Sequence, residues 1–186
     1  MTGSAIFSDC GKYRYLLRRG DRHAEKKCLF IMLNPSTADA ERDDPTIRRC
    51  RSFAERWGYG ELLVVNLFAY RATSPKELRS ADDPVGPDNR HWVERAVRAA
   101  SCEYDYDREE DVPPFVVCAW GNHGSYMGQD QTMLGWLEAF GVEPSCLSTT
   151  KARQPGHPLY LPQRTLPMPY DACGVSGELS NLGGAP

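Results

Sequence analysis

The stretch LFIMLNPST, residues 29–37, joins a run of five apolar residues to a polar loop that opens on Asn34 and Pro35. An apolar run of this length is typical of a strand that is covered on both faces of a parallel sheet. Similar runs at residues 62–65 and 115–119 are also followed by polar residues. In open α/β sheets, ligands bind beyond the carboxyl ends of the parallel strands. The sequence therefore predicts a site built on the strand ends of an α/β domain.

Segments with helical spacing alternate with these runs. Asp44 and Pro45 form a cap and first turn for a helix. Two further amphipathic segments, residues 92–100 and 133–140, follow the second and third apolar runs. Residues 12–19, ahead of the first run, have the alternation of an edge strand or hairpin. We therefore expect a three-layer α/β/α sandwich with a mainly four-stranded parallel sheet.

Length and composition fit one domain. The chain has 186 residues, of which 41% are hydrophobic and 25% charged, as in ordinary globular proteins. We assign residues 1–170 to a single domain and residues 171–186 to a flexible C-terminal tail. The polar stretches 71–87 and 103–111 are predicted to be loops. The net charge of −3 argues against a general polyanion binder, although a local basic patch could still bind nucleic acid.

The seven cysteines include no Cys-x-x-Cys pair, which is the spacing of many zinc and redox sites. Cys28, Cys118 and Cys146 lie in or beside apolar runs, where a reduced cysteine behaves as a small buried hydrophobe. There is no cleavable signal pattern and no apolar run as long as a membrane span. We therefore expect a cytoplasmic protein that contacts no membrane and needs no cofactor.

An acidic group offers one alternative. Asp39, Asp43 and Asp44 could together hold Mg²⁺. However, Asp44 is also explained as a helix cap, and acidic residues beside arginines commonly form surface ion pairs. We therefore predict no metal site.

Several motifs in a fixed order resemble the signature of a bacterial and phage family known only as domain of unknown function 1643. The motifs are MLNPSTAD (32–39), DPTIRR (44–49), NLFAYRAT (66–73), AWG (119–121) and HPLY (157–160). The resemblance covers residues 10–162 and is specific because the motifs occur together in order. The family name implies no activity.

The same order of features resembles, more distantly, the uracil-DNA glycosylase superfamily. Its members have Asp-Pro or Asn-Pro after strand one, Asn closing strand two, Trp-Gly after strand three and a His-Pro loop after strand four. The resemblance implies that Asn34 positions the attacking water, Asn66 recognises a pyrimidine edge and His157 stabilises the departing base. It implies an enzyme that excises a uracil-like or modified pyrimidine from DNA.

These residue types suit base excision. A glycosylase must take the nucleotide out of the base stack to reach the bond that it breaks. The Asn66 amide can donate and accept at once, as recognition of an O4 and N3–H edge requires. A donor at His157 would stabilise the negative charge that grows on the base O2. Asn34 would position water rather than deprotonate it, because an amide is a poor base.

Other residues are candidates by their place beside these three. The candidates for substrate contact are Pro35, Ser36, Thr37, Phe68, Tyr70, Trp120, Leu159 and Tyr160, and those for nucleic-acid contact are Arg48, Arg49, Arg71 and His123. Ser36 stands where uracil-specific enzymes have a tyrosine that excludes a 5-methyl group, so thymine or a bulkier pyrimidine would fit. No residue is an assured counterpart of the base-stacking phenylalanine, although Phe68 and Tyr70 follow Asn66 closely.

Each candidate also has a purely structural interpretation. An Asn-Pro pair commonly opens a turn, and a strand-end residue such as Asn66 could bond a neighbouring loop. Trp120 fits core packing better than base stacking. Arginines on an amphipathic helix usually form its solvated face.

Three classes of function stay open at this point: a glycosylase-like enzyme on DNA, a non-catalytic nucleobase or DNA-binding module, and a hydrolase or transferase on a small nucleotide. The last would use Ser36 or Thr37 as nucleophile or phosphate ligand and His157 as base. It needs His157 within hydrogen-bond reach of those hydroxyls, whereas excision needs Asn34 and His157 on opposite sides of one pocket. The sequence leaves the oligomeric state open.

Overall fold

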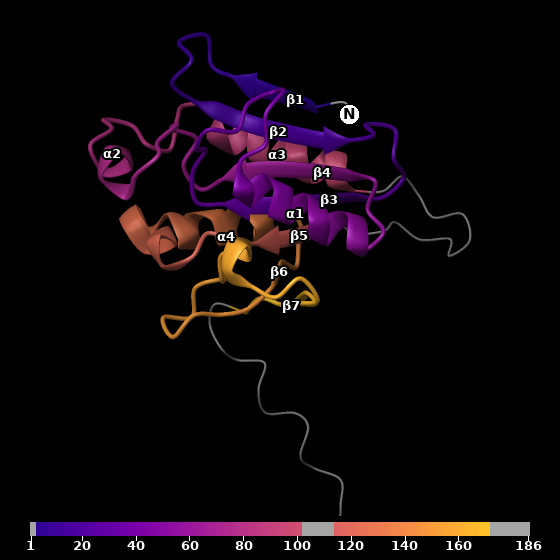
Figure 1. The fold of residues 1–186 in the computed structure, drawn as a ribbon. Coiled ribbons are helices and arrows are strands. Elements are labelled where there is room, and N and C mark those ends of the chain that lie inside the picture. The colour runs from indigo at the N-terminus through magenta and orange to yellow at the C-terminus, as the bar shows by residue number, and fades with distance from the viewer. Residues whose placement is uncertain (1–2, 102–113, 172–186) are drawn as a thin grey trace, which may run out of the picture.

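The computed structural model describes residues 3–101 and 114–171, which form an α/β fold (Figure 1). In this part of the chain, seven strands form one sheet in the order β1-β2-β4-β3-β5-β6-β7. The strands are β1 (Gly3–Phe7), β2 (Arg14–Gly20), β3 (Lys27–Met32), β4 (Glu61–Asn66), β5 (Phe115–Cys118), β6 (Ser145–Cys146) and β7 (Met168–Pro169). The helices are α1 (Pro45–Arg56), α2 (Pro75–Arg79), α3 (Asn89–Ala100) and α4 (Gln129–Ala139), with 3-10 helices η1 (Asn122–Gly128) and η2 (Pro158–Tyr160).

The sheet is mixed. β4, β3, β5 and β6 pair in parallel, while β1 and β2 extend one edge and β7 extends the other in antiparallel pairing. The prediction of an α/β protein is confirmed. The predicted strand at residues 12–19 forms a hairpin with β1, which leaves β2 inside the sheet rather than at its edge. The sheet is larger than the expected mainly four-stranded parallel sheet, because β1 and β7 add antiparallel strands that the sequence did not indicate.

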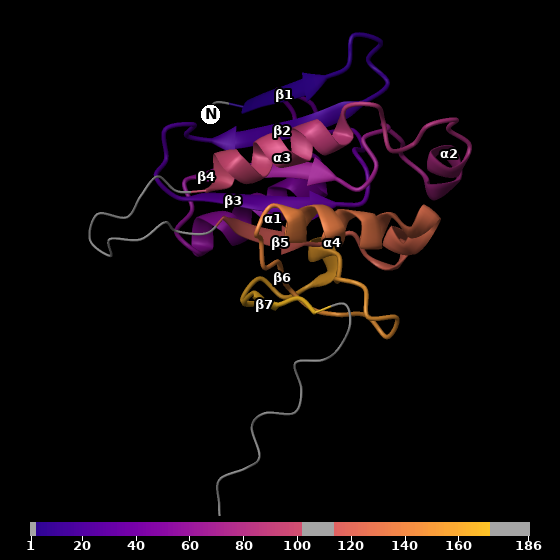
Figure 2. The same cartoon turned by 180° about the vertical axis from the view of Figure 1, so that it is seen from behind.

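Helices cover both faces of the sheet. α1 packs on one face, where Phe30 and Met32 of β3 point, and α3 and α4 pack on the other, where Leu29 and Ile31 point. Figure 2 shows α3 and α4 from that second side. Because the strand residues alternate between two helical layers, β3 from Cys28 to Met32 and β4 from Leu62 to Val65 are continuously apolar.

Local sequence signals explain where α1 begins and ends. The Asp44 carboxylate accepts a hydrogen bond from the Ile47 backbone N–H, and Pro45 occupies the first turn. Gly58 follows the helix with φ +85°, a conformation that glycine adopts without strain. The predicted loop 71–87 differs from the structure because it contains α2, where Ser74 and Glu77 form a capping box.

A β-bulge in β2 changes the direction of one side chain. Ile6 pairs with Leu16, but the next residue of β1, Phe7, pairs with Arg14, so β2 has one extra residue. Tyr15 therefore stays on the α3 face, where its ring stacks on Trp92. Arg14 instead donates from Nη1 to the carbonyl of Ala38 (2.7 Å), which belongs to the core of the α1 face. The bulge thus buries a guanidinium beneath the loop that leads to α1.

Some expectations lie outside the described residues, namely the acidic loop 103–111 and, apart from Asp171, the C-terminal tail 171–186. None of the helices in the described ranges is long and apolar enough to span a membrane.

Cys28, Cys118 and Cys146 are buried and unbridged, as their apolar surroundings in the sequence predict. Burial raises the pKa of the Cys146 thiol to about 11, so it stays protonated.

Candidate functional site

The polar residues after β3 and β4 lie side by side. Met32 pairs with Asn66 in the parallel register, and beyond this pair the Leu67 N–H donates to the Met32 carbonyl (2.9 Å) and the Phe68 N–H to the Leu33 carbonyl (3.0 Å). The loop that starts at Asn34 therefore runs next to the segment that follows Asn66. The sheet brings these two predicted site residues to one edge.

The Asn66 side chain is buried without a hydrogen-bond partner. The residue is 1% exposed, and neither its Nδ2 nor its Oδ1 bonds to any described residue. Leu62 and Val64 of the same strand point to the α1 face, so alternation places the Asn66 amide on that face as well. The alternative that Asn66 bonds a neighbouring loop is not seen. A buried amide without partners costs about 1–3 kcal/mol of folding free energy, which indicates a purpose other than stability.

The Asn34 amide is held in one orientation. Its Nδ2 donates to the carbonyls of Pro35 (2.9 Å) and Ala72 (2.8 Å), which uses both amide hydrogens. Its Oδ1 bonds to no described residue. The side chain therefore stabilises the loop, as its structural interpretation proposes, and also presents an acceptor that a water molecule could donate to.

His157 is placed by a close approach of its loop to the end of β6. The Gly156 N–H donates to the Ser148 carbonyl (2.7 Å), and a Cβ at position 156 would collide with the Ser148 hydroxyl. The His157 Nδ1 accepts from the Leu159 N–H (3.3 Å), so the neutral ring carries its proton on Nε2. Burial lowers the pKa of His157, and nearby Asp44 opposes this shift. His157 is therefore a neutral hydrogen-bond donor near the N-terminus of α1.

Contacts with α1 hold the loop that carries His157. The guanidinium of Arg49 donates from Nη2 to the carbonyl of Leu161 and lies over the ring of Phe53. The neighbouring Arg48 is exposed and donates to the carbonyl of Asp43 (2.6 Å). Arg48 and Arg49 were both predicted to contact nucleic acid. In the structure, Arg49 instead connects α1 to the residue that follows η2.

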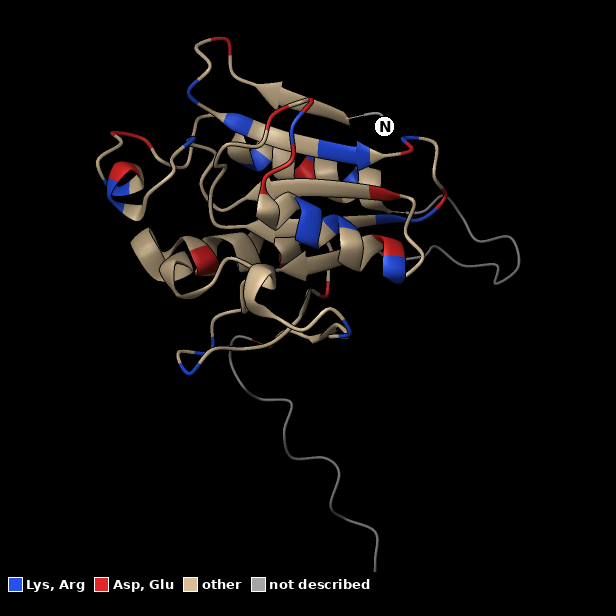
Figure 3. Ribbon diagram, viewed as in Figure 1, with Lys and Arg blue, Asp and Glu red and all other residues tan. Residues whose placement is uncertain are grey.

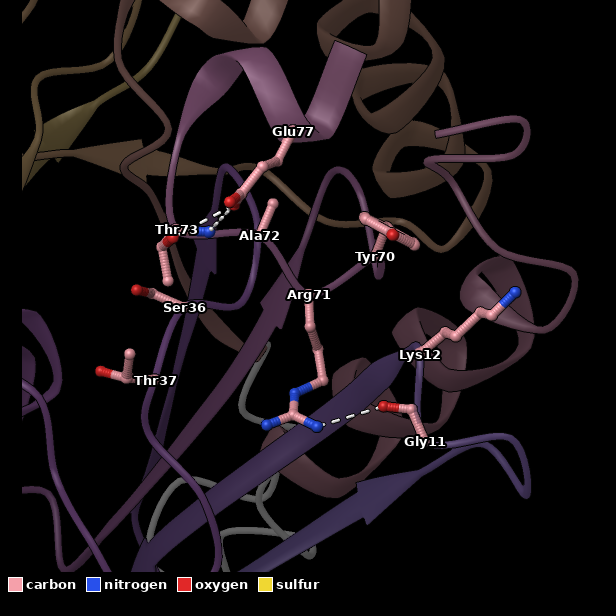
Figure 4. Close-up of a pocket in the computed structure, with 9 residues that line it drawn as sticks. All are labelled: Gly11, Lys12, Ser36, Thr37, Tyr70, Arg71, Ala72, Thr73 and Glu77. Atoms are coloured by element: carbon pink, nitrogen blue, oxygen red, sulfur yellow. Dashed lines mark hydrogen bonds between the residues drawn. The ribbon is translucent and has the colours of Figure 1, made fainter. Parts of the chain in front are cut away.

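A pocket of about 520 Å³ lies beside Asn34 (Figure 4). Residues from three separate segments line it: Gly11, Lys12, Ser36, Thr37, Tyr70, Arg71, Ala72, Thr73 and Glu77. Four of these were predicted site residues, namely Ser36, Thr37, Tyr70 and Arg71. Gly11 and Lys12 were missed because no local pattern shows that the turn between β1 and β2 reaches the loop after β3.

Other predicted site residues lie elsewhere. Phe68 and Trp120 belong to the core on the α3 and α4 face, and the Trp120 indole donates to Gln154 Oε1 (2.7 Å). The structure therefore does not bring these two rings to the side of Asn66. His123 is exposed in η1, and Tyr160, next to the His157 loop, is 83% exposed. Leu159 is also exposed and Pro35 is buried.

The acidic residues of the loop before α1 have structural partners. Asp43 pairs with Arg19 (2.5 Å) and Arg51 (3.0 Å), and the Asp39 carboxylate accepts from the backbone of Glu41 and Arg42. Together with the capping role of Asp44, these bonds account for the three residues considered for Mg²⁺. Within residues 3–101 and 114–171, no group of three or more His, Cys, Asp or Glu side chains could hold a metal ion.

Segments with positive and with negative residues alternate along the ribbon in the view of Figure 3. Figure 3 shows Lys and Arg on β2 and α1, with Asp and Glu in neighbouring segments. The net charge of the whole chain is −3. Contact with a polyanion would have to be local.

Comparison with known proteins places the chain in a family. A family model described as "Protein of unknown function (DUF1643)" matches residues 14–159. No curated protein and no solved structure gives a match. The matched range contains Asn34, Asn66 and His157 and most of the 186 residues. The chain therefore belongs to the DUF1643 family of proteins of unknown function.

Proposed function

We propose that this protein binds a nucleobase of DNA at the carboxyl ends of β3, β4 and β6, and excises a uracil-like or modified pyrimidine by hydrolysing its N-glycosidic bond. The observation that carries this proposal is the buried Asn66 amide, whose donor and acceptor both lack partners in the described residues. An amide in this state matches a pyrimidine edge, which offers one acceptor and one donor. The proposal includes a cytoplasmic location, where DNA would be the partner.

The order of the motifs along the sheet supports a glycosylase-like site. Asn34 follows β3, Asn66 closes β4, Trp120 follows β5 and His157 follows β6, and these strands pair in parallel. This is the order of motifs in the uracil-DNA glycosylase superfamily described above. Helices on both faces fit the same comparison, so the proposal extends to a glycosylase-like α/β/α sandwich.

The three side chains suit the steps of excision. Asn66 would hold the O4 and N3–H edge of a base taken out of the stack. His157, donating from Nε2, would stabilise negative charge on O2 as the C1′–N1 bond breaks and its electron pair moves to the base. Asn34 Oδ1 would orient a water that adds to C1′ and passes its proton to solvent or to the base. The products are free base and an abasic site.

The residue at position 36 bears on the choice of base. Ser36 is small and half-buried beside the Asn34 loop. A serine leaves room at C5 of a pyrimidine where a tyrosine would fill it. We therefore include thymine and 5-substituted pyrimidines among the bases accepted.

The position of His157 counts against nucleotide hydrolysis with a hydroxyl nucleophile. His157 does not line the pocket that contains Ser36 and Thr37. The His157 ring accepts a hydrogen bond from the Leu159 N–H, and no hydrogen bond joins it to either hydroxyl in the described residues. A base that activates a hydroxyl must lie within hydrogen-bond reach of it.

Single-turnover cleavage tests the proposal. Oligonucleotides, single-stranded and duplex, would carry one uracil, mismatched thymine, hypoxanthine or 5-substituted pyrimidine, and alkali would cut the abasic sites formed. Wild type should release one class of base, and His157→Ala should slow release by about 10²–10³-fold, as does loss of one donor to a developing oxyanion. Asn34→Ala and Asn66→Ala should also reduce release, and His23→Ala is the matched control because His23 is exposed in the turn between β2 and β3, away from the carboxyl ends of the strands.

The other outcomes are equally informative. A wild type that binds the strands without releasing a base would contradict excision and establish a binding module, provided that Asn66→Ala weakens that binding. A protein that neither binds nor cuts any strand would contradict both. Far-ultraviolet circular dichroism of each variant separates loss of function from loss of fold.

A further inference from the structure

The pocket of about 520 Å³ beside Asn34 is separate from the base site proposed above and is lined by polar and charged side chains. The Ser36 and Thr37 side of the loop lies opposite Gly11 and Lys12 of the β1–β2 turn, and Arg71 projects between Thr37 and Gly11 (Figure 4). The base site proposed above lies on the α1 face, whereas this pocket lies between the hairpin and the loop. The two are neighbours because residues 34–37 border both.

Arg71 is held in place with most of its donors unused. Its Nη1 donates to the Gly11 carbonyl (3.1 Å), and its guanidinium carbon lies 5.0 Å from the centre of the Phe7 ring. These contacts fix an exposed side chain that has no carboxylate partner among the described residues. A guanidinium has five N–H donors in a planar fork, which matches two oxygens of a phosphate.

The hydroxyls on the opposite side are also unpaired. Neither Ser36 nor Thr37 makes a side-chain hydrogen bond to any described residue, although both line the pocket. Lys12 lines the outer part and has no carboxylate partner there either. The pocket therefore combines two cations and two hydroxyl donors, as an anion site requires.

A buried positive charge lies behind the same loop. Arg14, 2% exposed, donates to the carbonyl of Ala38, the residue after Thr37. Its Nε has no partner, and no carboxylate pairs with it in the described residues. Because a buried charge is poorly screened, its potential extends into the pocket. Asp44 and Asp39 act on Arg14 without pairing with it, and an anion in the pocket would add to this partial compensation.

The carboxylate of Glu77 limits where an anion could lie. Its Oε2 accepts hydrogen bonds from the Thr73 N–H (2.8 Å), the Thr73 hydroxyl (3.1 Å) and the Ser74 N–H (3.2 Å). These bonds lower the pKa of Glu77, so it stays ionised and directed at the α2 cap. The anion is therefore expected at the Arg71 end of the pocket.

We propose that this pocket binds a phosphate ester of a nucleic-acid strand or nucleotide, with Arg71 as its main ligand, Ser36 and Thr37 as donors and Lys12 at the rim. The inference rests on the proposed function, because the loop that lines the pocket also carries Asn34. It adds the turn between β1 and β2 to the substrate-binding surface. A phosphate held here would fix the strand while its base enters the site of Asn66.

Fluorescence anisotropy tests the pocket without requiring excision. The probe is a 5′-labelled single-stranded 12-mer of adenine and cytosine only, titrated in increasing salt. Arg71→Gln should weaken binding by about tenfold in low salt and reduce the slope of log K against log salt by about 0.7–1, the effect of one lost phosphate contact. Lys12→Gln should have a smaller effect. Arg98→Gln is the matched control, because Arg98 is exposed on α3 and pairs with Glu94.

Competition identifies the source of the phosphate. In one outcome, thymidine 5′-monophosphate displaces the strand from wild type but not from Arg71→Gln, and thymidine displaces it from neither. This outcome would assign the site to the terminal phosphate of a nucleotide. Binding of the strand that depends on Arg71 but resists the monophosphate would assign it to a backbone phosphodiester. The inference is overturned if wild type binds neither probe, or if Arg71→Gln and the Lys12→Gln, Arg71→Gln double variant keep wild-type affinity and salt slope.

These results are separable from those on excision. If base release is never seen, Arg71-dependent binding of the unmodified strand still supports the pocket. If the pocket is wrong, base release that depends on His157 is unaffected by Arg71→Gln. Each proposal therefore fails by its own measurement.

Discussion

Two sites at the same carboxyl edge, one on each face of the sheet, differ in the pairing of their buried polar groups, although unpaired polar atoms such as Gln129 Nε2 also occur in the described residues of α4. On the α4 side, Trp120 Nε1 donates to Gln154 Oε1 (2.7 Å), and Gln154 Nε2 donates to Asp130 Oδ2 (2.7 Å). On the α1 side, the Asn66 amide and Arg14 Nε are buried without partners in the described residues. Both regions carry family motifs, so a motif alone does not distinguish packing from binding.

The contrast is sharpest between two asparagines that touch. Asn89 of α3 is fully buried, and its Nδ2 donates to the carbonyls of Asn66 (3.1 Å) and Leu67 (3.0 Å). Its Nδ2 therefore fixes the backbone at the end of β4, although its own Oδ1 has no partner in the described residues, whereas in Asn66 both the donor and the acceptor lack one. Where buried polar atoms are paired, their hydrogen bonds stabilise the fold, and this accounts for the polar residue at that position. Lack of pairing leaves a cost in folding free energy that binding of a ligand would offset.

The largest expected effect is on the α4 side. Trp120→Ala should lower the free energy of unfolding by about 3–5 kcal/mol, because it leaves a cavity in the core and removes the partner of Gln154. Urea unfolding at pH 7 followed by circular dichroism measures this. Tyr160→Ala is the comparison variant, since an aromatic ring that is 83% exposed should change stability by about 0.5 kcal/mol or less. A stable Trp120→Ala that no longer binds DNA would place Trp120 in the site and break the contrast between the faces.

The two asparagines should respond in opposite ways to the same substitution. Asn89→Leu should lower the free energy of unfolding by about 1–3 kcal/mol, because it leaves two buried carbonyls with fewer donors. Asn66→Leu should leave it unchanged or raise it, because it replaces an unpaired amide by an apolar group of similar size. The same urea experiment measures both, and base release or binding should be lost in Asn66→Leu. Equal destabilisation by the two would show that Asn66 has a structural role.

Much of the fold could be predicted from the sequence because its main elements are long and buried. Apolar runs locate β3, β4 and β5, and helical spacing with the Asp44 cap locates α1. α2 was missed although Ser74 and Glu77 give its capping box, because a helix of five residues has no periodicity to detect. β7 has two residues and depends on pairing with β6, which local sequence does not specify.

The candidate site was predictable in part for the same reason. Asn34, Asn66 and His157 stand out as polar residues after apolar runs, and parallel pairing brings the first two together. Arg14 was not predictable as a buried group, because a bulge is a property of the register between two strands. The partner of Trp120 is Gln154, 34 residues away, so its packing role also needed the tertiary structure.

The smallest expected effect is a pH dependence on the α1 side. Burial lowers the pKa of His157 below its ordinary value of 6.5, so below that pH the unfolded chain binds a proton more readily than the folded one. The stability associated with neutral His157 should be present above about pH 6.5 and lost as the pH falls towards the lowered value. His157→Gln removes this contribution, so the difference in unfolding free energy between wild type and variant should shrink from pH 7.5 to pH 5.5. Urea unfolding at both values measures it, with His123→Gln as the matched histidine variant. A difference that grows instead would mean that Asp44 outweighs burial, and His157 would then be a charged donor rather than a neutral one.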